Sequence, residues 1–231
     1  MTWVLSEMEW QALALSLRAS VLAVLFSLPL ALALGWLLAR RRFPGHALLN
    51  AFLHLPLVLP PVVIGYLLLL LFGRKGVIGG PLMEQFGIRV AFSTTGVIVA
   101  CAVVSFPLLL RSIRQAAEAA DKRLEKAARS LGAGEARIFA TVTLPMLAPG
   151  ILTGMTLAFA RAVGEFGATI TLAANIPGHT QTLPLALFTV TQVPGEDAAA
   201  ARLCLLSILL AGAALFASEA VARRMTWEPQ A

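Results

Sequence analysis

The distribution of apolar residues constrains this chain more than any other feature. Crossing the hydrocarbon core of a membrane takes about 20 apolar residues in a helix. Five apolar segments approach or exceed that length, namely Leu13–Ala39, Ala47–Phe72, Thr95–Leu110, Pro149–Ala173 and Ala201–Val221. A backbone in lipid must satisfy its own hydrogen bonds, and the chain lacks the alternation typical of barrel strands. We therefore predict an all-α integral membrane protein with five transmembrane helices.

The low content of charged residues supports this prediction. Only 13% of the 231 residues are charged, whereas soluble domains contain about 25%. No stretch is long and polar enough for a separate soluble domain, so we treat residues 1–231 as a single transmembrane domain. The net charge of +6 comes from basic residues at the ends of apolar segments, as the positive-inside rule requires. Nucleic acid is therefore not an expected partner.

The positions of lysine and arginine predict the orientation. Arg40–Arg42, Arg111–Arg137 and Arg223–Arg224 contain three, seven and two basic residues, which is twelve of the 18 in the chain. Alternate connections of a five-helix chain carry these three groups, so we expect them on the cytoplasmic side. The N-terminus is then extracytoplasmic and the C-terminus cytoplasmic. We expect residues 182–193, which are apolar but too short to span, to form a re-entrant or interfacial helix at the outer mouth.

The stretch Gln115–Pro145 is the one long charged interlude in the chain. It predicts an alanine-rich helix, a break at Gly132-Ala133-Gly134 and a second short helix that Leu144-Pro145 stops. One interpretation is a surface helix that covers the ends of the membrane helices. That interpretation accounts for the charge but not for the glycine break and the proline stop. A helix that docks into a partner accounts for all three.

Charge spacing predicts ion pairs along the first of these helices. Glu118 and Lys122 are four residues apart, as are Glu125 and Arg129. Both pairs have the acidic residue on the N-terminal side, which is the favoured direction in a helix.

Sequence motifs for catalysis are missing. The chain contains no G-x-x-x-x-G-K-[ST] phosphate loop, no H-E-x-x-H and no G-x-S-x-G. Cys101 and Cys204 lie within apolar segments, where cysteine is usually a small packing residue. We expect no enzyme activity, metal or cofactor, so uphill transport would draw its energy from a partner or an ion gradient.

Two charges interrupt the fourth apolar segment. Arg161 and Glu165 are four residues apart and share one face of a helix. Charges within a bilayer are costly unless they pair or face water. The pair is either a structural link between helices or part of an anion path, to which the hydroxyl of Thr169 could contribute.

Glycines on the same segment predict close approach to a neighbouring helix. They form Gly150-x-x-x-Gly154 and Gly164-x-x-Gly167, spacings at which small residues let backbones approach each other. The expected neighbour is a second copy of the chain.

The second apolar segment contains an unusual cluster of prolines. Pro56, Pro60 and Pro61 remove backbone donors and predict a kink. Irregular backbone at membrane depth is tolerated where it is buried in protein or lines a cavity. The cluster predicts either a bent packing helix or, through Pro60 and Pro61, the wall or gate of a channel.

Nearly the whole chain resembles the permeases of bacterial molybdate ABC importers. The resemblance is carried by six runs of sequence: LHLPLVLPPVVIGYLLL from Leu53, FGRKGVIG from Phe72, VVSFPLLLRSIRQA from Val103, LEKAARSLGAGEARIFATVTLP from Leu124, FARAVGEFGATIT from Phe159 and NIPGHTQTLPLALF from Asn175. The fourth run resembles the EAA loop, which docks onto the ATPase in these importers. GEFGATIT and NIPGxTQTLP narrow the likeness to oxyanion permeases.

The resemblance implies a type I importer fold in the inner membrane. It implies a homodimer, two cytoplasmic ATPase subunits and an extracytoplasmic molybdate-binding protein. The ATPase-coupling residues that it implies are Glu125, Lys126, Ala127, Ala128, Arg129, Gly132, Ala133, Gly134 and Arg137. Lys126 departs from the pattern, which has an acidic residue there. The translocation path would include Pro60, Pro61, Arg161, Glu165 and Thr169.

The same sequence features are compatible with other transport functions. A tungstate, sulfate or thiosulfate permease would share these motifs. An ion-gradient-driven anion transporter or channel would also account for the hydrophobicity and for Arg161 and Glu165. Such transporters often contain internal repeats, and we find none.

Overall fold

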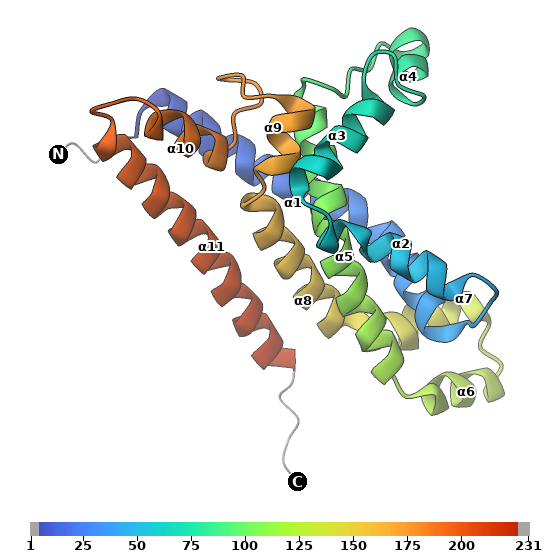
Figure 1. The fold of residues 1–231 in the computed structure, drawn as a ribbon. Helices are drawn as coiled ribbons and strands as arrows, with labels where there is room; N and C mark the ends of the chain where they lie inside the picture. Colours follow the sequence, from blue (N-terminus) through green and yellow to red (C-terminus); the bar gives the residue numbers. More distant parts are fainter. Residues whose placement is uncertain (1–4, 226–231) are drawn as a thin grey trace.

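The protein is a helical bundle, as predicted. The computed structural model describes residues 5–225, which contain helices and no strand (Figure 1). The four longest helices are α1 (Glu7–Arg40), α5 (Thr94–Ala119), α8 (Leu144–Val163) and α11 (Asp197–Met225). The shorter helices are α2 (His46–Val58), α3 (Pro61–Phe72), α4 (Gly79–Phe86), α6 (Lys122–Ser130), α7 (Glu135–Ile138), the π-helix η1 (Phe139–Thr143), α9 (Gly167–Ala173) and α10 (Leu183–Thr191).

Within residues 5–225, four helical stretches are long and apolar enough to cross a membrane, counting α7, η1 and α8 as the single stretch Glu135–Val163. A fifth span results if α2 and α3, which meet at an angle of 116°, are counted together. Five apolar spans were predicted, but two of them are broken. The segment Ala47–Phe72 divides between Val58 and Pro61, and the segment Pro149–Ala173 divides between Val163 and Gly167.

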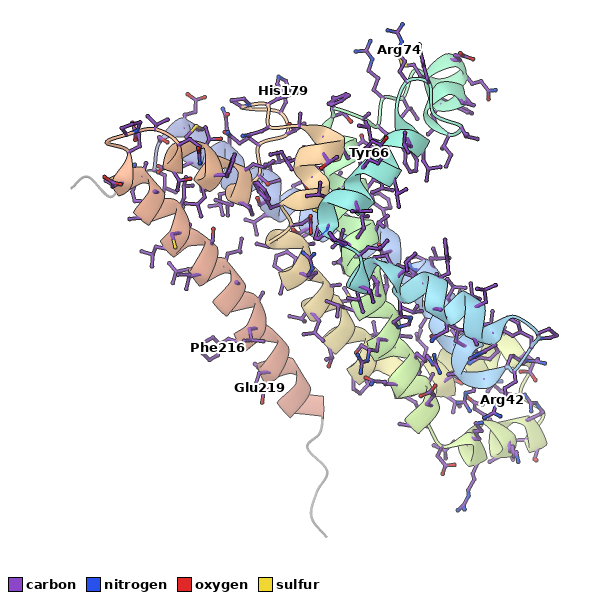
Figure 2. All side chains as sticks on the ribbon, viewed as in Figure 1. Arg42, Tyr66, Arg74, His179, Phe216 and Glu219 are labelled. Atoms are coloured by element: carbon purple, nitrogen blue, oxygen red, sulfur yellow. The ribbon has the colours of Figure 1, made fainter. Side chains whose placement is uncertain are left out.

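The bundle has two distinct ends (Figure 1). The start of α1 lies at the same end as α4, α9 and α10, which we call the α4 end. The C-terminal end of α1 lies at the opposite end with α6 and α7, which we call the α6 end. Arg42 and Arg74 stand at the α6 end and the α4 end, respectively (Figure 2). The basic groups at Arg40–Arg42 and Arg111–Arg137 therefore share one end, whereas the side chains of Arg223 and Arg224 lie outside the described residues.

Local signals explain where several helices begin. The Ser6 hydroxyl accepts a hydrogen bond from the Glu9 amide at 3.2 Å, and the Glu9 carboxylate accepts one from the Ser6 amide at 2.7 Å. This capping box satisfies backbone donors that have no partner inside α1. The Ser93 hydroxyl accepts a single hydrogen bond from the Gly96 amide at the start of α5, and the Asp121 carboxylate accepts one from the Arg123 amide at the start of α6. The predicted stop at Leu144-Pro145 is wrong, because the helical stretch continues from η1 into α8 through Pro145.

Small residues let α1, α5 and α8 pack closely in the core. A Cβ atom added at Gly150 would lie 2.3 Å from the Cβ of Ala116, and one at Gly154 would lie 3.0 Å from the Cβ of Ser112. The Ser112 hydroxyl also donates to the Gly150 carbonyl at 2.8 Å. Gly150 and Gly154 thus face α5 of the same chain, and Gly167 faces Pro61 of α3, so the expectation that these three contact a second copy is wrong. Gly164 faces no other element of the described chain. The sequence showed that a neighbour approaches closely, but not which one.

Replacement of Gly150 by alanine is expected to destabilise the bundle. Alanine favours a helix by about 1 kcal/mol over glycine, but overpacking of a close contact costs about 1–3 kcal/mol. Gly212 in α11 is the matched control, because a Cβ there would meet nothing within 4 Å. Thermal unfolding in detergent should show a lower midpoint for Gly150→Ala than for Gly212→Ala. Equal midpoints would contradict the close α5–α8 contact.

Candidate coupling surface and translocation site

Helix α6 presents an exposed apolar face at the α6 end. Leu124, Ala127, Ala128 and Leu131 follow the i, i+3, i+4, i+7 spacing of one helix face. Leu124 is 52% exposed and Leu131 is 88% exposed, and none of the residues in α6 is buried. An apolar stripe on an otherwise charged helix gains stability when another surface covers it. No described part of the chain covers this one.

The turn after α6 requires glycine. The Gly132 amide bonds to the Arg129 carbonyl at 3.0 Å, and the Ala133 amide bonds to the Ala128 carbonyl at 3.1 Å. These two bonds form a Schellman motif, in which the residue after the helix adopts a left-handed conformation. Gly132 has φ +82°, whereas Gly134 has φ −70°. Only the first glycine of the predicted break is therefore required by backbone conformation.

Ion pairs fix α6 to the rest of the bundle, but they are not the predicted ones. The Arg40 Nη2 at the end of α1 donates to Glu125 Oε1 at 2.8 Å, and the Thr143 hydroxyl donates to the same oxygen at 3.0 Å. The predicted pairs Glu118–Lys122 and Glu125–Arg129 are wrong, because α5 ends before Asp121 and Glu125 turns toward α1. Glu118 instead contacts Arg114 at 2.7 Å, and Arg129 contacts Glu135 at 2.6 Å.

An aromatic contact adds to this attachment. The rings of Trp36 in α1 and Phe139 in η1 meet edge to face, with centroids 6.4 Å apart. Together with Arg40, Glu125 and Thr143, they join α6 and η1 to the α6 end of α1. Sequence reasoning missed Arg40, Thr143, Trp36 and Phe139, because 85 residues separate Arg40 from Glu125 and no local spacing signals the contact.

The two broken helices meet at their breaks. A Cβ atom at Gly167 would lie 2.9 Å from the Cβ of Pro61, and one at Gly65 would lie 2.7 Å from the Ala168 carbonyl oxygen. Helices α3 and α9 therefore pack backbone against backbone. The structure brings the predicted path residue Pro61 next to the segment that holds Glu165 and Thr169.

Glu165 organises the second break. Its Oε1 accepts a hydrogen bond from the Ala168 amide at 2.7 Å, which caps the first turn of α9. Its Oε2 lies 2.7 Å from the Arg161 Nη1, in an ion pair without hydrogen-bond geometry. The carboxylate is fully buried, whereas the Arg161 side chain is 31% exposed. Thr169 is buried beside the thiol of Cys101. The predicted Arg161–Glu165 pair is confirmed, and the guanidinium keeps an accessible side.

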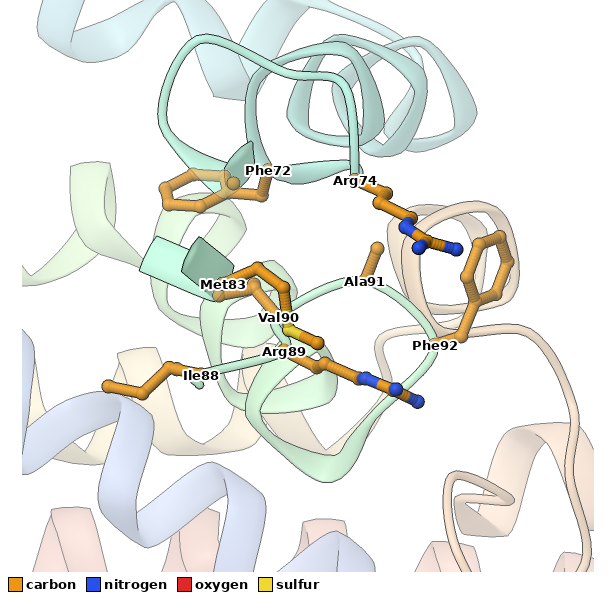
Figure 3. Close-up of a pocket in the computed structure, with 9 residues that line it drawn as sticks. Phe72, Arg74, Met83, Ile88, Arg89, Val90, Ala91 and Phe92 are labelled. Atoms are coloured by element: carbon orange, nitrogen blue, oxygen red, sulfur yellow. The ribbon is translucent and has the colours of Figure 1, made fainter. Parts of the chain in front are cut away.

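A third feature lies at the α4 end. A pocket of about 250 Å³ is lined by Phe72, Arg74, Met83, Arg89 and Phe92, among others. Both arginine side chains extend toward Phe92 (Figure 3). The Phe92 amide donates to the Leu172 carbonyl at 3.0 Å, which links the pocket to the C-terminal end of α9.

The sequence matches a known family of membrane transport proteins. Residues 31–227 match the family described as "Binding-protein-dependent transport system inner membrane component". The chain belongs to this family. It is therefore a multi-pass inner-membrane protein, in agreement with its apolar helices.

Individual proteins give finer comparisons. The chain is 58% identical over 220 residues to the "Molybdenum transport system permease protein ModB" of Escherichia coli (strain K12), covering 95% of this chain and 96% of that protein. It is 37% identical over 202 residues to the "Sulfate transport system permease protein CysT" of Salmonella typhimurium, covering 86% of this chain and 73% of that protein. The fold is similar to a chain of the bacterial alginate ABC transporter, solved in complex with an alginate pentasaccharide-bound periplasmic protein. That match has a TM-score of 0.72 at 18% identity and covers 96% of this chain and 81% of that one.

Substitution of Gly132 is expected to destabilise the turn after α6, whereas substitution of Gly134 is not. Gly132→Leu places a side chain in the left-handed region, at a cost of about 1–2 kcal/mol. Limited digestion with trypsin should therefore cleave faster in this variant after Arg129 and Arg137, which flank the turn. Gly134→Leu is the control, because its backbone suits any residue and a Cβ meets nothing within 4 Å. Equal cleavage of both variants would contradict the role of the turn.

The Arg161–Glu165 pair predicts non-additive substitutions. Arg161→Met leaves a buried carboxylate without its counter-ion and should lower stability by about 2–3 kcal/mol, somewhat less than for a fully buried pair. The double variant Arg161→Met/Glu165→Gln keeps the cap of α9 and should be more stable than Arg161→Met alone. Chemical unfolding of Arg161→Met, Glu165→Gln and the double variant measures the coupling free energy between the two side chains. Additive changes would contradict the pairing.

Proposed function

We propose that this chain is the permease subunit of an ATP-driven importer of molybdate. Two copies would form the membrane path, two ATPase subunits would dock in the cytoplasm, and an extracytoplasmic protein would deliver the oxyanion. The permease itself would catalyse no reaction. The 58% identical relative, named as a molybdenum transport permease and matched over 95% of this chain, supports the cargo. The proposed coupling to an ATPase rests on one observation, the exposed apolar face of α6.

The α6 end would face the cytoplasm, because most basic residues gather there. In this orientation the stripe of Leu124, Ala127 and Leu131 is available to a soluble partner. A helix that lays its apolar face into a groove is a common mode of protein recognition. Nucleotide-driven movement of the ATPase subunits would reach α1 through the Arg40–Glu125 ion pair and the Trp36–Phe139 contact.

The α4 end would then face the binding protein. Arg74 and Arg89 line the pocket there, and neither forms an ion pair with another described residue. Such exposed cations favour an acidic partner surface and speed its approach. The oxyanion would leave the binding protein at this end.

The path would run beside the two helix breaks. Pro60, Pro61 and Glu165 hold irregular backbone, which membrane proteins tolerate against other protein or beside a cavity. Arg161 offers an accessible cation, but Glu165 neutralises much of its charge. A partly neutralised cation attracts an oxyanion without retaining it. Weak affinity along the path suits uphill import, so selectivity would reside mainly in the binding protein.

Reconstitution of the complete transporter in vesicles tests this proposal. The chain should co-purify with an ATPase subunit, and the molybdate-loaded binding protein should raise ATP hydrolysis. Gly132→Leu should reduce that stimulation while leaving membrane insertion intact. If no ATPase co-purifies, the proposal fails. If stimulation by the sulfate-loaded and the molybdate-loaded protein is equal, the assignment of molybdate fails and a broader oxyanion permease remains.

The docking surface needs a matched control in the same experiment. Leu131→Asp places a charge on the apolar face of α6 and should abolish association with the ATPase. Val77→Asp makes the same kind of change at the α4 end, where Val77 is 83% exposed, similar to the 88% of Leu131. Association should persist in the control. Equal loss in both variants would contradict docking at α6.

A further inference from the structure

A large basic cavity lies between α1, α2 and α5 at the α6 end. It measures about 1070 Å³, and its lining includes five arginine or lysine residues, one histidine and one acidic residue. We call it the basic cavity and define it by Arg40, Arg41, Arg42, His46, Arg114 and Lys122. The acidic residue, Glu118, is already paired with Arg114. Glu125, outside the lining, pairs with Arg40. Arg41, Arg42 and Lys122 form no ion pair with another described residue, so the basic cavity has an excess of positive charge.

Arg40 contributes a nearly buried guanidinium to the wall of the basic cavity. Its side chain is only 7% exposed, and Glu125 contacts its Nη2. Its Nε and Nη1 are buried without a hydrogen-bond partner. Buried donors on a charged group are costly when left unpaired. The exposed side chains of Arg41, Arg42 and Lys122 are the ones that an anion in the basic cavity would contact.

An apolar groove lies between the same three helices and α3. It measures about 690 Å³, and the only polar side chain in its lining is Ser27. We call it the apolar groove and define it by Leu30 of α1, Phe52 and Pro56 of α2, Leu67 of α3, and Phe106 of α5. Burial in this groove does not stabilise a sulfate- or molybdate-sized anion, whereas it stabilises hydrocarbon chains by removing apolar surface from water.

The two compartments are aligned along the helices. Leu30 precedes Arg40 by ten residues of α1, which is about 15 Å at 1.5 Å per residue. Phe106 precedes Arg114 by eight residues of α5, which is about 12 Å. One leaflet of the hydrocarbon core is about 15 Å thick. The spacing from basic cavity to apolar groove therefore matches the distance from a lipid headgroup into its acyl chains.

We propose that this region binds one anionic phospholipid per chain. The phosphate lies in the basic cavity, near Arg40, Arg41 and Arg42, and the acyl chains lie in the apolar groove. Basic pockets between membrane helices on the cytoplasmic side are a known setting for such headgroups. The proposal rests on the orientation proposed above, in which the α6 end faces the cytoplasm. Because Arg40 also pairs with Glu125, the bound lipid would adjoin the attachment of α6.

Native mass spectrometry of the purified transporter tests this proposal. Phosphatidylglycerol should remain bound at one lipid per chain and raise the unfolding temperature, whereas phosphatidylcholine should do neither. Arg41→Gln/Arg42→Gln should weaken phosphatidylglycerol binding about 30-fold, since each basic residue near an anionic headgroup contributes about fivefold. These two arginines are exposed and form no ion pair with another described residue, so their replacement should not disturb the fold.

Arg74→Gln/Lys75→Gln is the matched control, because it removes two adjacent exposed cations at the α4 end. It should leave phosphatidylglycerol binding unchanged. Equal weakening in both double variants, or equal retention of phosphatidylcholine, would overturn the proposal. Equal stabilisation by inorganic phosphate would overturn it too, because the basic cavity would then bind a free anion.

The apolar groove has its own test. Leu30→Trp fills it and should displace the bound lipid, whereas Leu209→Trp changes an exposed residue of α11 outside it. If Leu30→Trp leaves the lipid bound but dissociates the two copies of the chain, the apolar groove is an interface between copies and the proposal fails. Lipid retention does not depend on the transported solute, so this result stands apart from the molybdate assay.

Discussion

The meeting of two broken helices is the constraint on which the rest of the structure depends. Inside a membrane no water is available to satisfy backbone groups, so a helix can be interrupted only where protein covers the break. The break before Pro61 is covered by α9, and the break at Glu165 is capped by the carboxylate of that residue. Each break is tolerated because the other lies against it. The closest contact requires Gly65 and Gly167, since side chains there would separate the two backbones. The accessible side of Arg161 follows from this arrangement, because Glu165 must both cap α9 and neutralise the guanidinium.

The two sides of α6 differ in chemical character and in role. The face that points away from the bundle is apolar, and the side that holds α6 in place is ionic. Glu125 is held by Arg40 from α1 and by Thr143 from η1. A push on α6 is therefore transmitted to two separate membrane helices. The proposed lipid would lie at the same arginine and could adjust how firmly α6 is held.

The sequence predicted the parts of this structure that depend on local patterns. Apolar runs located the membrane helices, and the spacing of Arg161 and Glu165 predicted their ion pair. It failed where the outcome depended on distant partners. Glu125 has a suitable partner four residues away, yet it pairs with Arg40, because α6 lies against the end of α1. The glycines of α8 predicted close packing, but only the fold shows that α5 is the neighbour. The break at Glu165 was missed because the residues on both sides are apolar and a helical pattern continues through it.

The π-helix η1 has a consequence for the chain that follows it. An α-helix turns by 100° per residue, and a π-turn accommodates one additional residue in the same stretch. Side chains before and after η1 therefore belong to two different angular registers of one continuous helix. Phe139 can face Trp36 while Gly150 faces α5, although an uninterrupted α-helix would orient them otherwise. Removal of one residue from η1 would bring both halves into one register and turn α6 by about 100° around the axis of α8. The orientation of the exposed apolar face relative to the membrane thus depends on a single extra residue.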